Sequence, residues 1–176
     1  MKNFDQIKEL AAGNFGLVTA AQVRELGIAS FQLARWVKMG WLEKSARGVY
    51  RVSDYPASEY DPFAVAVESV GPEGMICGES VLGMLQLTDT NPTWIHVGTV
   101  SRKRRALSDG IRLEPLAASE TPEYYEGVRC QSVSNAIRQC KGRISPERLR
   151  EAIDNAYRNG YVMKHEVAGL RKEIDA

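Results

Sequence analysis

The sequence predicts an α+β protein built from two parts. Over residues 1–53, apolar residues recur at helical spacing in three short segments, and a stretch of alternating apolar and polar residues follows them. Residues 53–62 interrupt both patterns with acids, proline, serine and tyrosine, which is typical of a linker. We therefore expect an N-terminal winged helix-turn-helix over residues 1–53. A small mixed β-sheet domain with C-terminal helices should follow over residues 62–176.

The N-terminal part has the element order of a winged helix-turn-helix. Its first helix should stop at Gly13, and its second follows the capping-box pattern Thr19–Gln22, whose side chains can satisfy free amide groups there. A turn containing Gly27 leads to a third helix over residues 30–40. The segment "WLEKSARGVYRV", residues 41–52, then predicts a two-stranded hairpin around "SARG". Two helices joined by a short turn and followed by a hairpin make up the motif.

The second part alternates between strand patterns and helical patterns. We expect strands over residues 75–77, 94–100, 111–116 and 128–133. We expect helices over residues 61–70, 79–87, 145–160 and 164–174, with a further helical pattern from residue 134 onward. The strands should form one small sheet with the helices beside it.

The third helix has two faces of different character. With Leu33 as the reference and about 100° per residue, an apolar face lies within about 60° of that position. This face contains Leu33, Trp36 and Val37. The opposite face, within about 40° of the far pole, contains Phe31, Arg35 and Lys38. The apolar face should pack in the core, and Trp36 is expected there rather than against a base. Phe31 either covers the turn before the helix or contacts a thymine methyl group, and packing is slightly favoured.

An exposed polar helix face has the right size and chemistry for the major groove of DNA. Arg35 can donate to guanine through two parallel hydrogen bonds, and Gln32 can pair with adenine. Ser30 or the helix N-terminus can contact a phosphate. Hairpin cations can hold backbone phosphates or enter the minor groove. The candidate DNA-binding residues are Ser30, Gln32, Arg35, Lys38, Lys44, Arg47 and Arg51. The alternative is an ordinary solvated helix face, and spacing alone does not separate the two.

Charge is unevenly distributed, although the net charge is only +1. Residues 1–52 contain eight Lys or Arg and four acids, whereas residues 53–101 contain seven acids and no Lys or Arg. Such asymmetry indicates different partners for different surfaces. The strongest basic run lies between two expected strands and consists of Arg102, Lys103, Arg104 and Arg105. It fits a solvated loop, a phosphate contact or a docking site for an acidic partner.

No catalytic or metal-binding pattern stands out. The histidines, His96 and His165, have no His or Cys at ligand spacing, and phosphate-binding glycine loops are absent. Three widely spaced cysteines, Cys77, Cys130 and Cys140, form neither a disulfide framework nor a zinc pattern, which favours a reducing cytoplasm. No window is long and apolar enough for a membrane span, and the N-terminus does not fit a signal peptide. We expect no enzyme activity, cofactor, metal or membrane partner.

Several motifs carry a family resemblance. The segment "GLVTAAQVRELGIASFQLARWVKMGWLEKSARGVYRV" resembles the N-terminal winged helix of AbiEi-type antitoxins of type IV toxin–antitoxin systems, especially at Arg47-Gly48-Val49-Tyr50. Further similar segments are "MICGESVLGMLQL", "WIHVGTVSRKRR", "IRLEP" and "IDNAYRNGYVMKHEV". One segment departs from the family: "SVSNAIRQC" stands where many relatives have a proline and Arg-Thr before a leucine-rich helix.

The resemblance implies a transcriptional regulator of abortive infection, a phage-defence response. Such a protein binds repeated sequences at its own promoter and counters a nucleotidyltransferase toxin through its C-terminal part. It places DNA contacts on Ser30, Gln32, Arg35, Lys38, Lys44 and Arg47. The expected partners are double-stranded operator DNA and the cognate toxin. The alternative function is a protein-binding adaptor, in which the winged helix is a scaffold and Arg102–Arg105 docks a partner; a nuclease is a distant third.

Overall fold

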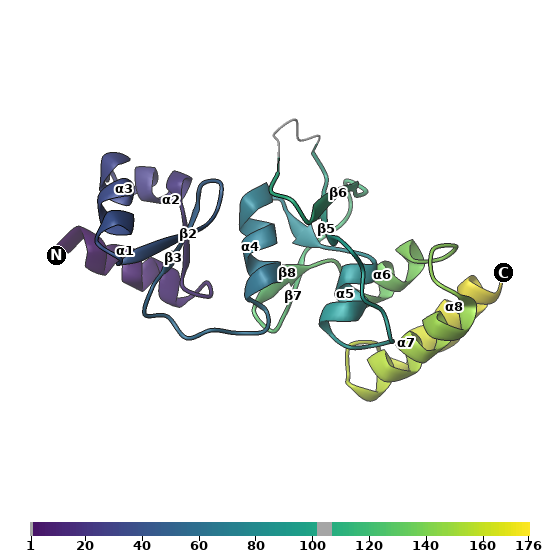
Figure 1. Cartoon of the computed structure of the whole chain (residues 1–176). Helices are drawn as coiled ribbons and strands as arrows, with labels where there is room; N and C mark the ends of the chain where they lie inside the picture. Colours follow the sequence, from purple (N-terminus) through teal and green to yellow (C-terminus); the bar gives the residue numbers. More distant parts are fainter. Residues whose placement is uncertain (1, 102–106) are drawn as a thin grey trace. The chain divides into compact units, whose positions relative to one another are not determined.

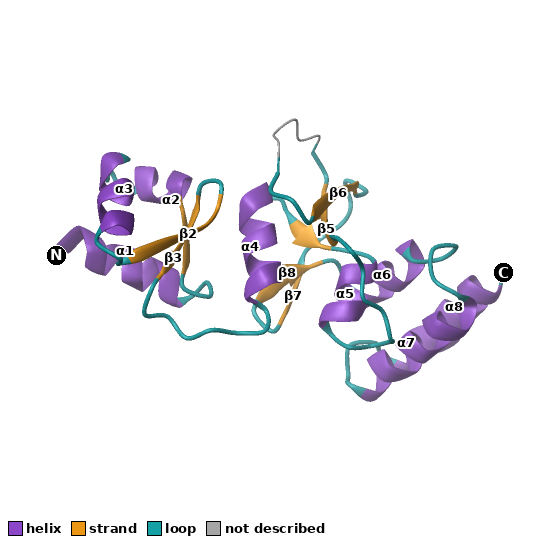
Figure 2. Cartoon of the chain, viewed as in Figure 1, coloured by secondary structure: helices purple, strands orange, loops and turns teal. Residues whose placement is uncertain are grey.

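The computed structural model describes residues 2–101 and 107–176 (Figure 1). Among these, residues 2–72 form one compact unit, and residues 73–101 and 110–176 form a second. Both units combine helices with a β-sheet, as the colouring by secondary structure in Figure 2 shows. The predicted α+β class is therefore confirmed.

The first unit is a winged helix with a three-stranded sheet. Its elements are α1 (Lys2–Ala12), β1 (Leu17–Thr19), α2 (Ala20–Glu25), α3 (Phe31–Lys38), β2 (Leu42–Ala46), β3 (Val49–Val52) and α4 (Asp61–Val70). The capping box forms as predicted, because the Thr19 hydroxyl accepts from the Gln22 amide and the Gln22 side chain accepts from the Thr19 amide. Strand β1 joins the hairpin, and the antiparallel order is β1-β3-β2. The pattern did not predict β1, since three residues are too few to display alternation.

Helices cover both faces of this small sheet. Directly paired residues of neighbouring strands share a face, and successive residues alternate between faces. Val18 pairs with Tyr50, and these residues face the core formed with α1, α2 and α3. Leu17 and Val49 lie on the other face, where they pack with Ala64 of α4.

The packing of α4 places the boundary between the units after Pro72. The linker composition had suggested an earlier boundary, with residues 62–176 as the second domain. The helix itself lies where the sequence predicted it, but its apolar residues cover a sheet face that would otherwise expose Leu17 and Val49. The winged-helix unit therefore includes one helix more than its sequence motif.

The second unit is a mixed sheet with four helices. Its strands are β4 (Met75–Ile76), β5 (Ile95–Thr99), β6 (Ile111–Pro115), β7 (Glu123–Tyr125) and β8 (Val128–Cys130), in the order β6-β5-β4-β8-β7. Its helices are α5 (Glu79–Met84), α6 (Val133–Gln139), α7 (Pro146–Arg158) and α8 (Lys164–Asp175). The β5–β6 and β4–β8 pairs are parallel, and the other two pairs are antiparallel. Its core includes Ile76, Leu82, Val97, Ile137, Leu149, Ile153 and Leu170.

Two details of the second unit differ from the sequence prediction. The strand expected to reach residue 133 ends at Cys130, because the Ser132 hydroxyl accepts from the Asn135 amide and starts α6. Strand β7 was not predicted, since two of its three residues are exposed at the edge of the sheet. In the part of the chain that the structure describes, no helix combines the length and apolar character needed to cross a bilayer.

Candidate nucleic-acid interface

The recognition-helix candidate α3 is fixed to the first unit by its apolar face. Leu33 and Trp36 are buried in the core, and Val37 packs against the same cluster. The Phe4 ring of α1 contacts Trp36 at a centroid distance of 5.3 Å. Truncating a buried side chain of this size costs about 3–5 kcal/mol, so this face holds α3 in one orientation. The residues predicted for the apolar face of α3 therefore do face the core.

The opposite face of α3 is exposed and carries unpaired cations. Arg35 and Lys38 are exposed, and neither makes an ion pair with any residue that the structure describes. The side chain of Ser30 makes no capping hydrogen bond, and Gln32 is half-buried at the flank. The helix sequence, "FQLARWVK", contains no acidic residue. This face therefore offers hydrogen-bond donors with no carboxylate beside them on the helix.

Phe31 is 65% exposed, so it does not cover the turn before α3. That turn is closed by Ile28, which is buried and donates its amide to the carbonyl of Val23. Gly27 permits the turn, because its φ of 72° lies in the left-handed region. The slightly favoured packing role for Phe31 is thus wrong, and an exposed aromatic residue stands beside the cations of α3.

The hairpin adds two exposed cations, Lys44 and Arg47. Pairing of Ala46 with Val49 closes the turn. The turn requires a positive φ, which Gly48 adopts. Lys44 pairs with Tyr50 and therefore shares the sheet face on which α1, α2 and α3 pack. Neither Lys44 nor Arg47 forms an ion pair within residues 2–101 and 107–176.

Arg51, the last hairpin candidate, is not available to a ligand in this structure. Its guanidinium pairs with the Asp61 carboxylate and also donates to the carbonyl oxygens of Tyr55 and Pro56. The reason is the alternation of β3, which places Arg51 on the sheet face covered by α4. The predicted DNA contact at Arg51 is therefore corrected to a structural clamp between β3 and the start of α4.

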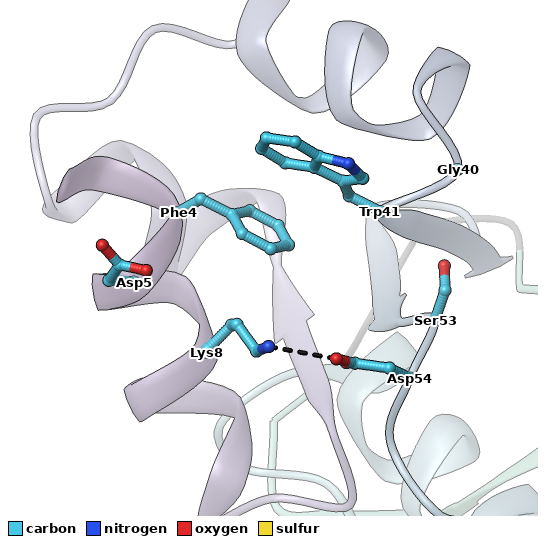
Figure 3. Close-up of a pocket in the computed structure, with 7 residues that line it drawn as sticks. All are labelled: Phe4, Asp5, Lys8, Gly40, Trp41, Ser53 and Asp54. Atoms are coloured by element: carbon cyan, nitrogen blue, oxygen red, sulfur yellow. Dashed lines mark hydrogen bonds and ion pairs between the residues drawn. The ribbon is translucent and has the colours of Figure 1, made fainter. Parts of the chain in front are cut away.

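A cavity of about 360 Å³ lies in the first unit, where α1 meets the chain that follows α3 (Figure 3). Phe4 and Trp41 form one wall, with ring centroids 4.8 Å apart. Lys8 and Asp54 form another wall, and Lys8 Nζ lies 3.0 Å from Asp54 Oδ2. Lys8 is thus paired, unlike Arg35, Lys38, Lys44 and Arg47, which have no ion-pair partner among the described residues.

Two further points concern the basic residues. Arg24 of α2 was not among the candidates, yet it is exposed and unpaired among the described residues. In the sequence, only its position on the polar face of the second helix could have indicated that Arg24 is exposed. Arg102, Lys103, Arg104 and Arg105 lie outside the described residues.

Three comparisons with known proteins were made, and one of them matches a family over the winged helix. A search of curated proteins finds no match. Among solved structures, the RV2827C protein from Mycobacterium tuberculosis is similar at 15% sequence identity and a TM-score of 0.49, over 95% of this chain and 79% of that one. Residues 5–53 match the family described as a transcriptional regulator, AbiEi antitoxin. This match runs from α1 to the end of the hairpin, and the family is one of regulators rather than an enzyme class. The resemblance of this chain to AbiEi antitoxins is thereby confirmed over its winged helix.

Proposed function

We propose that this chain is a DNA-binding autorepressor whose helix α3 enters the major groove while the hairpin contacts the backbone. The observation that carries the proposal is the exposed face of α3, which carries Phe31 together with Arg35 and Lys38, two cations without an ion-pair partner among the described residues, opposite a buried apolar face. A helix fits the major groove, and a guanidinium there can read guanine through two hydrogen bonds. Lys44 and Arg47 would then hold phosphates beside the groove.

We further propose that the protein is the antitoxin of a type IV toxin–antitoxin system in the cytoplasm. The family match supports a regulator or antitoxin role for the chain. In this proposal, residues 62–176 counter a toxin that is a nucleotidyltransferase. Operator DNA and this toxin are therefore the two proposed partners.

The DNA-binding proposal is tested with the protein's own upstream DNA in a fluorescence anisotropy titration. The double variant Arg35→Ala, Lys38→Ala removes two cations from α3. Each phosphate contact contributes about 0.9 to the slope of log K against log salt. Loss of the Arg35 contact to guanine should cost about 1–3 kcal/mol of binding free energy. If Lys38 contacts a phosphate, the slope should also fall by about 0.9.

The matched control is Arg148→Ala, Lys164→Ala. Both residues are exposed in the second unit, and neither side chain has an ion-pair partner among the described residues. The control removes the same charge and should bind operator DNA like the wild type. Wild-type affinity in the α3 variant, with its circular dichroism spectrum unchanged, would refute the assignment and favour the adaptor alternative.

The antitoxin proposal is tested in cells. The gene beside this one should encode a nucleotidyltransferase-like protein whose expression stops growth, and co-expression of this chain should restore growth. Persistent growth arrest with full expression of both proteins would refute the antitoxin role, and it would leave the DNA-binding result untouched.

A further inference from the structure

The second unit contains a polar cavity of about 610 Å³ that the DNA-binding proposal does not use. Its wall includes Glu79, Trp94, His96, Arg112, Glu114 and Arg143. Volumes of this order are typical of small-molecule sites. The cavity is therefore large enough for a ligand, and the chemistry of its wall indicates which kind.

The register of two parallel strands brings the polar residues together. His96 of β5 pairs with Arg112 of β6, and Gly98 pairs with Glu114. Because side chains alternate along a strand, His96, Arg112 and Glu114 share one face of the sheet. Gly98 has no side chain, and Leu116 packs over it so closely that a Cβ atom at this position would collide with the Leu116 side chain.

An ionic triad of two buried residues, Glu114 and His96, and the half-exposed Arg143 forms one wall of the cavity. Glu114 and His96 are each only 9% exposed. His96 Nδ1 lies 3.1 Å from Glu114 Oε1, and Arg143 donates Nη1 and Nη2 to the two carboxylate oxygens at 3.1 and 3.3 Å. Burial raises the pKa of Glu114, but hydrogen bonds from Arg143 and His96 outweigh it and hold the pKa below its ordinary value. An ionised carboxylate can only accept hydrogen bonds, so His96 Nδ1 carries the proton in the hydrogen bond with Glu114.

Desolvation makes such a triad costly for stability alone. Replacing a buried ion network by apolar residues is often neutral or stabilising, so stability alone is a weak reason for Glu114, His96 and Arg143 to lie together. Titratable groups that shift one another's ionisation beside a cavity mark candidate binding sites. The triad thus points to a ligand rather than to a packing role.

Three groups around the triad remain free to contact a ligand. Arg112 is exposed and unpaired among the described residues. His96 Nε2 makes no hydrogen bond in the part of the chain that the structure describes. Trp94 is 43% exposed, although it is a large aromatic residue at the cavity wall. A guanidinium pairs with a phosphate or carboxylate, and an indole face stacks on a planar ring.

The cavity has no activated nucleophile. The nearest thiols belong to Cys77 and Cys140, which interact with Glu114 and Arg143, and burial raises the pKa of each to about 12. A thiol with so high a pKa stays protonated and unreactive at neutral pH. The chemistry therefore favours reversible binding over covalent catalysis.

We propose that this cavity binds a small aromatic anion. Arg112 pairs with its phosphate or carboxylate, Trp94 stacks on its ring, and His96 Nε2 contacts a polar atom of the ligand. Glu114 and Arg143 hold the wall in place through their mutual hydrogen bonds. This site does not rest on DNA binding by the first unit, and it gives the second unit a ligand of its own.

The test is isothermal titration calorimetry of the full chain with adenosine 5′-monophosphate and, separately, with indole-3-acetate. We expect a Kd of about 1 mM or tighter, equivalent to about 4 kcal/mol, for at least one probe. Adenosine lacks the anionic group and inorganic phosphate lacks the aromatic ring, so each should bind at least tenfold more weakly. Binding of the nucleotide alone identifies a phosphate ligand, and binding of indole-3-acetate alone identifies a carboxylate ligand.

Two variants distinguish this site from nonspecific binding. Arg112→Gln should weaken binding of the active probe at least tenfold, whereas Arg148→Gln, an exposed and unpaired arginine of α7, should leave it unchanged. Arg112→Gln should keep wild-type affinity for operator DNA. The proposal is overturned if both probes bind more weakly than about 1 mM or if Arg112→Gln binds like the wild type.

Discussion

The ion pair between Arg51 and Asp61 joins β3 to the start of α4, so Arg51→Met should destabilise the first unit without weakening DNA binding. The two side chains are only 16% and 14% exposed. Removing one partner of a buried pair costs about 3–5 kcal/mol, because the other charge is left without its counterion. Asp61 still accepts from the Ser58 amide, and some water reaches the site. We therefore expect a loss of about 2–3 kcal/mol in unfolding free energy.

Urea denaturation measures this loss in a Trp94→Phe background. The two remaining tryptophans, Trp36 and Trp41, then report on the first unit alone. With a slope of about 1 kcal/mol per molar urea for so small a unit, the midpoint should fall by about 2–3 M. Asp61→Asn should produce a similar shift. The reasoning is refuted if Arg51→Met keeps the wild-type midpoint while its DNA-binding salt slope falls by about 0.9, the value for one lost phosphate contact.

Three further predictions follow from single residues. Phe31→Ala should change the free energy of unfolding by less than about 0.5 kcal/mol. It should weaken operator binding several-fold with an unchanged salt slope, since it removes apolar contact and no charge. Anisotropy titrations measure the affinity and the salt slope, and wild-type affinity would exclude a base contact. Gly16→Ala should cost more than about 1 kcal/mol in urea unfolding, because φ is 72° and the new Cβ would lie 2.5 Å from the Tyr55 ring, whereas Gly13→Ala, with open space, should be tolerated. Glu114 has a lowered pKa in the folded state, so it stabilises the second unit above its ordinary pKa of 4.5, and this stability is lost as pH falls through the lower folded value. Glu114→Gln should flatten the dependence of unfolding free energy on pH in that window, and an unchanged profile would contradict the assignment.

The local elements of the first unit could be predicted because their signals are local. Thr19 and Gln22 specify the start of α2 through side chains three residues apart. The apolar spacing of Leu33 and Trp36 orients α3. The role of α4 could not be predicted in this way, since its apolar residues would pack equally well against either unit. Only the pairing of β1 with β3 reveals the sheet face that α4 must cover.

The candidate site was predicted where helical geometry alone determines exposure. Arg35 and Lys38 are exposed as expected, because their positions follow from the helical period. The ion pair of Arg51 could not be predicted, since its partner Asp61 lies ten residues away, near the end of the linker segment. The triad in the second unit was hidden for the same reason: 18 residues separate His96 from Glu114, and 29 separate Glu114 from Arg143.

Cations of this chain differ in whether a carboxylate of the described residues lies against them. In the second unit, exposed arginines of three helices lie against carboxylates, and these pairs are Arg138–Glu173, Arg150–Asp175 and Arg171–Asp154. In the first unit, Lys8 and Arg51 are paired. Arg35 and Lys38 of α3 and Lys44 and Arg47 of the hairpin lack such partners among the described residues, and α3 contains no acid to supply one. Unpaired cations on one surface repel one another unless an anion of high charge density covers them. Because DNA is such an anion, binding should weaken steeply with salt, and this dependence should flatten when unpaired cations of the winged helix are removed but not when Arg148 and Lys164 are removed.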